Sequence, residues 1–187
     1  MDFYSDIESY FTTLKKTIDA TNKQEINRVL QLLSEAYHQE KLIFTMGNGG
    51  SAATASHMAN DFNKGISYGR DKKFKVISLC DNISTLMAIA NDVSYEAVFE
   101  EQLKNFLRPG DLVIGISGSG NSENVLRAIE YANTHQAITI GLTGYTGGKL
   151  KQSAKNGIHV EIMDMQITED LHMILNHLFM KALDNHL

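Results

Sequence analysis

Two short segments of this 187-residue chain combine glycines with hydroxyl groups, as a phosphate-binding site requires. One is Ser117-Gly118-Ser119-Gly120-Asn121-Ser122, which brings three hydroxyls and several backbone N–H groups together. The other is Gly47-Asn48-Gly49-Gly50-Ser51, whose glycines let the backbone approach a ligand closely and whose Ser51 suits a helix N-cap. Neutral donors of this kind bind a phosphate dianion without a lysine. Two such loops at one sheet edge indicate phosphate binding more strongly than either loop alone.

A second set of residues has the chemistry of proton transfer and metal binding. His57 and Asp61 are four residues apart in an expected helix and therefore share one face. In the last expected helix, Glu169 and His177 are two turns apart, about 12 Å along the axis, so they bracket a bound group rather than lie side by side. Histidine and carboxylate side chains serve as general acids, general bases and zinc ligands. His172 lies between them and is interpreted as an ordinary core or surface residue.

The first loop has two other interpretations. It is also compatible with a tight strand-to-helix turn that binds nothing. Gly47, Gly49 and Ala52 match the dinucleotide pattern G-x-G-x-x-A, but the acidic residue expected after the second strand has to be Asp81. No Gly-Lys-Ser/Thr follows the glycines, so the loop is not a Walker loop.

Strands and helices alternate along the chain and position these loops. Apolar runs typical of buried strands occupy residues 42–45, 76–80, 112–116, 137–142 and 158–162. Helical spacing of apolar residues predicts helices over 22–38, 51–62, 84–90, 95–107, 122–133 and 168–183, with Phe106 facing inward and a capping box of Asn22 and Glu25. We therefore expect one α/β domain over 1–187, with a parallel sheet covered by helices on both faces. Residues 1–38 are expected to form an N-terminal helical extension, a hairpin against the sheet or a neighbouring subunit.

Composition narrows the class of protein. With 43% hydrophobic and 21% charged residues, the chain can form a packed core. The net charge of −5 argues against nucleic acid as a partner. A single cysteine, Cys80, rules out an intrachain disulfide, and no apolar run approaches the ~18 residues that span a bilayer. The acidic N-terminus does not have the pattern of a signal peptide. We therefore expect a cytoplasmic protein without a membrane partner.

Together the two loops resemble those of SIS (sugar isomerase) domains, and more closely those of the phosphoheptose isomerases. The resemblance covers nearly the whole chain and includes Asn91-Asp92, Leu142-Thr143-Gly144 and Gly147-Gly148. Enzymes of that family convert sedoheptulose 7-phosphate into glycero-manno-heptose 7-phosphate for heptose biosynthesis. The resemblance implies a flavodoxin-like core and a homotetramer with active sites at subunit interfaces.

The resemblance also assigns roles to individual residues. The phosphate would be held by Ser51, Ser117, Ser119 and Ser122, with Asn48 and Asp81 near the sugar hydroxyls. Other substrate-binding candidates are Gly49, Gly50, Asn91, Asp92, Gly118 and Asn121, and Lys64 is a weak candidate where the family has an arginine. One zinc ion per subunit would be bound by His57, Asp61, Glu169 and His177. His177 would be the general acid.

The chain departs from the family at two of these positions. Asp61 stands where the family has its general base, a glutamate, and Glu169 stands where the family has glutamine. Both residues keep oxygen donors, so two histidines and two carboxylates remain an acceptable set of zinc ligands. A general base must come within hydrogen-bonding distance of the proton it removes, and aspartate is one methylene shorter than glutamate. Either the geometry compensates and Asp61 is the base, or Glu169 takes that role.

Three functions remain open at this point. The first is an aldose–ketose isomerase acting through an enediol on sedoheptulose 7-phosphate. The second is a non-catalytic SIS module that binds a sugar phosphate or the replication initiator protein. The initiator-binding branch lacks the carboxylate and the last-helix histidine, whereas this chain has Asp61 and His177. The third is an isomerase of another sugar phosphate, which the changes at Asp61 and Glu169 suggest.

Overall fold

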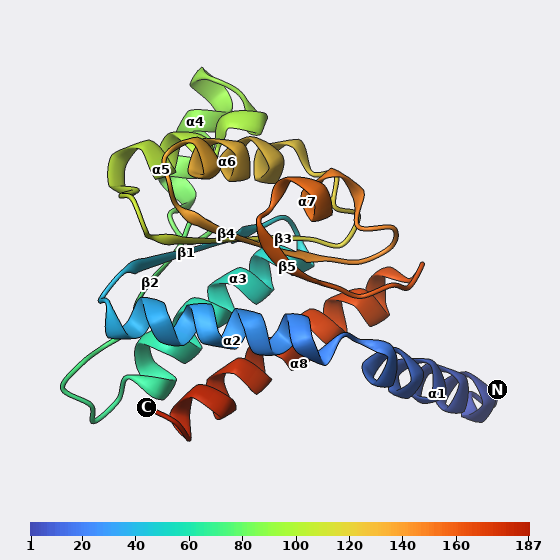
Figure 1. The fold of residues 1–187 in the computed structure, drawn as a ribbon. Helices are drawn as coiled ribbons and strands as arrows, with labels where there is room; N and C mark the ends of the chain where they lie inside the picture. Colours follow the sequence, from blue (N-terminus) through green and yellow to red (C-terminus); the bar gives the residue numbers. More distant parts are fainter.

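The computed structural model describes all 187 residues and contains one five-stranded parallel sheet (Figure 1). The strands are β1 (Leu42–Gly47), β2 (Lys75–Ser78), β3 (Leu112–Ser117), β4 (Ile138–Thr143) and β5 (Asn156–His159). Their order is β2-β1-β3-β4-β5, and every neighbouring pair is parallel. This is the strand order of the flavodoxin-like fold. The α/β class predicted from the alternating pattern is confirmed.

Helices cover both faces of the sheet (Figure 1). One layer holds α4 (Ile83–Asp92), the 3₁₀ helix η2 (Tyr95–Ala97), α5 (Glu100–Phe106), α6 (Glu123–Thr134) and α7 (Gly148–Ser153). The opposite layer holds α2 (Lys23–His38), α3 (Gly50–Asn60), the π-helix η1 (Asp61–Ile66) and α8 (Met165–Asp184), and α1 (Tyr4–Ala20) extends from it. Each layer buries its own apolar cluster against the sheet, so the strands are hydrophobic on both faces, as the unalternating runs predicted.

The N-terminal extension is helical, but it is not a hairpin. Asn22 caps α2 by accepting from the N–H groups of Gln24 and Glu25. Glu25 does not complete the predicted capping box, because its carboxylate accepts from the backbone N–H of His159 instead. Helix α1 points away from the body rather than folding back along α2 (Figure 1). The prediction of a hairpin was therefore wrong.

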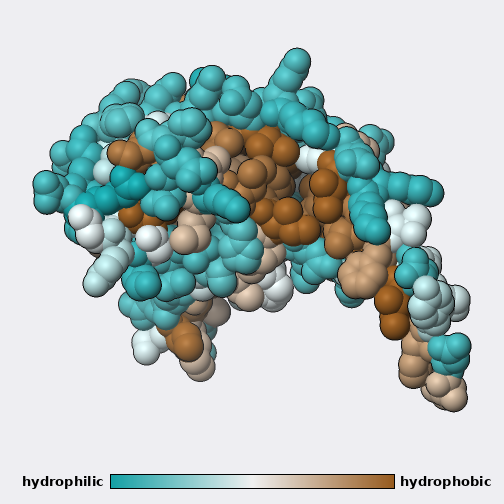
Figure 2. All heavy atoms as spheres, turned by 90° about the horizontal axis from the view of Figure 1, so that it is seen from below, coloured by the Kyte–Doolittle hydropathy of each residue, from teal (hydrophilic) through white to brown (hydrophobic).

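Helix α1 is an arm that contacts the body through Tyr10 and through Leu14, which packs against Val160, Ile167 and Leu171. The hydroxyl of Tyr10 donates to the carboxylate of Asp170, and this hydrogen bond raises the pKa of Tyr10 to about 12. The large apolar side chains that α1 and the preceding residues expose are Met1, Phe3, Tyr4, Ile7, Tyr10, Phe11 and Ile18. Figure 2 shows apolar side chains along the arm and in the hollow between the arm and the body.

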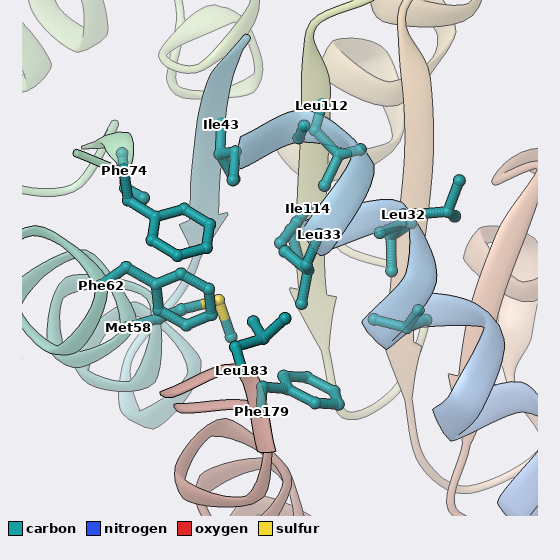
Figure 3. Packing of buried hydrophobic residues seen from close by; sticks show 14 of the residues in the cluster. Leu32, Leu33, Ile43, Met58, Phe62, Phe74, Leu112, Ile114, Phe179 and Leu183 are labelled. Carbon is teal, nitrogen blue, oxygen red and sulfur yellow. The ribbon is translucent and has the colours of Figure 1, made fainter. Parts of the chain in front are cut away.

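A tightly packed seam joins α3 and η1 to α8. Figure 3 shows Met58 and Phe62 from one side close to Phe179 and Leu183 from the other, and all four are buried. Each large apolar side chain buried here contributes about 1.5–3 kcal/mol. The seam fixes how the two helices lie against each other.

Other local expectations need correction. The helix predicted over 95–107 is two pieces, η2 and α5, and Phe106 is 51% exposed rather than inward-facing. The fifth strand spans Asn156–His159 rather than 158–162, because residues 160–164 already lead into α8. No helix is both long enough and apolar enough to cross a bilayer.

Candidate functional site

The two glycine- and serine-rich loops lie next to each other. Strands β1 and β3 are neighbours, and Gly47 at the end of β1 pairs with Ile116 at the end of β3. After β1 the chain adds β2 at one edge of β1 and then crosses over to add β3 at the other edge, so the strand order reverses between β1 and β3. Ligands of open parallel sheets bind at such a crevice, outside the carboxyl ends of the strands. The juxtaposition predicted for the loops is confirmed.

The first loop opens helix α3 one residue earlier than expected. Gly49, with φ of 55°, is the N-cap, and the helix begins at Gly50, so Ser51 is not the capping residue. Ser51 instead lies in the first turn with its side chain buried. The N–H groups of this first turn have no acceptor inside the helix and are suited to an anion.

The second loop clusters its hydroxyls at the start of α6. Ser117 Oγ lies 2.9 Å from Ser122 Oγ, and the N–H of Asn121 donates to Ser119 Oγ at 3.2 Å. Ser122 is the N-cap of α6, but its hydroxyl makes no capping bond and stays directed to the loop. Gly120 has φ of 67° and lies against the backbone of Gly147, so only glycine fits there.

An amide pair, of which Asn124 is buried and Asn48 half-buried, joins the first loop to the start of α6, and sequence analysis missed Asn124. Asn48 Nδ2 donates to Asn124 Oδ1 and Asn124 Nδ2 donates to Asn48 Oδ1, both at 2.9 Å. The hydroxyl of Tyr95 also donates to Asn48 Oδ1, at 2.7 Å. A polar residue among the inward-facing positions of α6 was the signal for Asn124. Nothing in the sequence indicated that Tyr95 would reach the loop.

Histidines from two helices meet around Asp61. His57 Nε2 is 3.1 Å from His177 Nε2, and Asp61 Oδ2 is 3.3 Å from the first nitrogen and 3.8 Å from the second. Asp61 is buried, while the two histidine side chains are 42% and 56% exposed. Asp61 begins the π-helix, a widened turn that often occurs at functional sites. His57 and Asp61, the pair predicted to share one face, are therefore in contact with His177 of the last helix.

The spacing of these three groups suits a zinc ion. One ligand atom from each of His57, Asp61 and His177 lies within 4.8 Å of the others. Bonds of about 2.0–2.1 Å in a tetrahedron place zinc-bound nitrogens about 3.4 Å apart, close to the separations found here. Three protein ligands leave a fourth position for water or substrate, which is the pattern of catalytic rather than structural zinc sites.

Glu169 lies outside this group. Its carboxylate rests against Gly50, so closely that a methyl group at Gly50 would overlap it. Glu169 is therefore beside the first loop, at the start of α3, whereas His177 is two turns further along α8. The structure does not bring the fourth expected ligand to the histidines.

Three other expected sugar contacts lie on neighbouring elements, Asp81 after β2 and the other two at the end of α4. Asp81 accepts a hydrogen bond from Ser56 and borders an open hollow that Lys64 also lines. Asn91 and Asp92 are exposed at the end of α4, where the amide of Asn91 donates to the carboxylate of Asp92. Helix α4 and the first loop enclose a hollow of about 260 Å³ that includes Asn48 and Tyr95.

His172 is a core residue, as expected, but an unsatisfied one. It is 1% exposed, and neither ring nitrogen has a hydrogen-bond partner. Burial lowers the pKa of His172 to about 4, and the nearby backbone of Thr143 opposes this only in part. His172 is therefore neutral in the folded protein near neutral pH.

Comparison with known proteins agrees with this fold. The model of the SIS domain family matches residues 7–144. The chain is 32% identical over 181 residues to a probable phosphoheptose isomerase of Thermoplasma volcanium, covering 97% of this chain and 92% of the relative. It is 39% identical over 154 residues to the phosphoheptose isomerase of a Nitratiruptor species, covering 80% of each. The structure of phosphoheptose isomerase from Neisseria gonorrhoeae superposes with a TM-score of 0.90 at 27% identity, covering 98% of this chain and all of that one.

The parallel sheet, the paired loops at its switch point and the family match define a SIS-domain protein. Within that class, the relatives covering most of its length show that the chain belongs to the phosphoheptose isomerase family.

Proposed function

We propose that this protein isomerises sedoheptulose 7-phosphate to D-glycero-D-manno-heptose 7-phosphate, a step of heptose biosynthesis. The observation that carries the proposal is the pairing of two phosphate-type loops, at the starts of α3 and α6, with a His57–Asp61–His177 group on α3, η1 and α8. A non-catalytic sugar-phosphate module needs the loops but has no use for the acid–base group. Family membership supports the same activity.

The loops hold the phosphate end of the open-chain sugar. Hydroxyls of Ser117, Ser119 and Ser122 and the amides at the starts of α3 and α6 supply neutral donors, and the Asn48–Asn124 pair keeps the two loops at a fixed spacing. Positioning of this kind turns proton transfer into an intramolecular step.

Proton transfer takes place at the other end of the sugar. Asp61 removes the proton from C1 of the ketose, which gives an enediolate, and returns it to C2 to form the aldose. His177 moves the second proton between the oxygens on C1 and C2. A zinc ion held by His57, Asp61 and His177 would polarise the carbonyl when bound. A carboxylate one methylene shorter than glutamate serves as the base because Asp61 Oδ2, rather than Glu169, faces both histidines.

The separation of the two ends favours a long sugar. His57 follows Gly50 by seven positions in α3, which is about 10 Å along the helix axis. An extended seven-carbon sugar phosphate spans a distance of this order, whereas a pentose phosphate is shorter by two carbons. We therefore propose a heptulose phosphate rather than a pentulose phosphate as the substrate.

Purified protein with added zinc is expected to turn over sedoheptulose 7-phosphate faster than hexulose or pentulose phosphates, measured by NMR.

Ser119→Ala is expected to weaken sugar-phosphate binding about 10- to 100-fold in calorimetry, because a hydrogen bond to a charged group contributes about 1.5–3 kcal/mol. Ser153→Ala removes a hydroxyl at the end of α7, away from the loops, and serves as the control. Sugar-phosphate binding without any turnover would favour the non-catalytic module, and equal affinities in both variants would contradict the phosphate site.

We propose further that the working form is a homotetramer with sites at subunit interfaces. The arm α1 and the exposed apolar residues of α8 support this, since Ile174 and Leu178 flank His177 and are 40% and 42% exposed. A partner that covered them would also close over the acid–base group. Cytoplasmic location belongs to the same proposal, consistent with a single cysteine and no disulfide.

Light scattering is expected to give four times the mass of one chain. Leu178→Glu should shift the protein to smaller species and lower turnover, because a buried charge disrupts an apolar interface. Phe106→Glu places the same charge on an exposed apolar position of the opposite layer and is expected to leave the mass unchanged. A monomeric wild type with full activity would contradict interface sites.

A further inference from the structure

Besides the two histidines, Asp61 has a further polar neighbour that the site described above does not include. Asn176 Nδ2 donates to Asp61 Oδ2 at 2.8 Å, the same oxygen that faces His57 and His177. Both residues are buried, and Asn176 is completely so. The amide therefore contacts the carboxylate from inside the protein, while the histidines contact it from the exposed side.

Asn176 is an unusual residue for its position. It lies on the buried face of α8, among positions that carry Leu171, Leu175 and Phe179. Its Oδ1 has no hydrogen-bond partner, so the bond to Asp61 is the only one its side chain makes. Burying an amide in this half-satisfied state is unfavourable compared with an apolar side chain of similar size. The hydrogen bond to Asp61 is therefore the feature that explains an asparagine at this buried position.

The side chain of Asp61 is one methylene shorter than that of glutamate, so the orientation of its carboxylate decides whether it reaches the histidines. A carboxylate on one methylene has two rotatable bonds, and Oδ2 must point to the histidines to bind metal or take a proton. A buried donor fixed by the α3–α8 seam selects that orientation, as partners behind metal ligands commonly do. We propose that Asn176 is a positioning residue, which holds Asp61 Oδ2 toward His57 and His177 and suits the site to aspartate. This inference rests on the proposed function, because it assigns a role within the same site.

Zinc affinity, measured by competition with a chromophoric chelator, provides a test that does not depend on turnover. Asn176→Leu keeps the branched shape and removes the donor, and it is expected to lower zinc affinity and kcat each about 10- to 100-fold. Asn133→Leu is the matched control, since Asn133 makes two side-chain hydrogen bonds on α6 at the opposite layer. The control is expected to bind zinc as the wild type does. A folded Asn176→Leu with wild-type zinc affinity, or an equal loss in Asn133→Leu, would overturn the proposal.

A pair of further variants keeps the test valid if Asn176→Leu does not fold. Asn176→Ala leaves room beside position 61, and Asp61→Glu adds the methylene that the family has there. Each single variant is expected to bind zinc more weakly, and the double variant is expected to recover at least tenfold relative to Asp61→Glu. Strictly multiplicative effects would show that the two positions are independent and would overturn the proposal. A wild type that neither binds zinc nor turns over substrate would instead contradict the proposed function.

Discussion

Replacing Asp61 with asparagine is expected to lower kcat for sedoheptulose 7-phosphate about 100- to 10,000-fold, the usual contribution of a general base. Asparagine has the same shape but cannot accept a proton at neutral pH. Glu169→Gln is expected to lower kcat less than tenfold, because the Glu169 carboxylate lies at the start of α3 and not beside the histidines. Steady-state kinetics of the two variants, measured by NMR, compares these carboxylates directly.

The effect of Asp61→Asn on proton transfer must be separated from its effect on metal binding. Both variants are therefore assayed at a zinc concentration that saturates each of them. Exchange of the substrate proton with deuterium from solvent then reports the base alone, and we expect it to be lost in Asp61→Asn and retained in Glu169→Gln. The opposite pattern would move the base to Glu169 and would require α8 to shift during the reaction.

The loops could be predicted from the sequence because their signals are local. Glycines and hydroxyls directly follow the apolar runs that end at Gly47 and Ser117, and parallel topology places the ends of those strands at one edge. The i, i+4 relation of His57 and Asp61 is equally local. These inferences required only helix and strand periodicity.

The meeting of His57 with His177 could not be derived in the same way. They are 120 residues apart, and their contact depends on how α3 lies against α8. That alignment is set by the packing of Met58 and Phe62 against Phe179, which no periodicity specifies. The separation of Glu169 from His177 follows from helix register alone, because residues two turns apart cannot come to one point, and the assignment of Glu169 as a zinc ligand rested on the family resemblance. A polar Asn176 on an apolar face was the available signal for the residue that sequence analysis missed.

The second large effect is expected from His172 and concerns stability. Its folded-state pKa, about 4, is below the value of about 6.5 for an unfolded histidine, so the unfolded chain binds more protons between these pH values. The stabilisation is fully present above pH 6.5 and is lost as the pH falls toward 4. A shift of this size corresponds to about 3 kcal/mol at the acid end.

Urea unfolding of His172→Leu and the wild type at several pH values measures this contribution. Leucine has a similar size and no charge, so the variant should equal or exceed the wild type in stability at pH 7.5, because it removes an unpartnered polar group. At pH 5 the variant should be the more stable by about 2 kcal/mol. A chelator and a fixed protein concentration keep metal binding and association out of the comparison.

His186→Leu is the matched control for this experiment. His186 is exposed at the end of the chain, so its replacement is expected to leave the pH dependence unchanged. The histidines that none of the variants replaces are common to all three proteins, so their contributions cancel in the differences between them. Parallel stability curves for His172→Leu and the wild type would mean that His172 is protonated without opening the core.

Because His172 lies one turn before Asn176 on α8, its protonation at low pH would also loosen the helix that carries His177. Zinc binding by the wild type should then weaken more steeply with acid than zinc binding by His172→Leu.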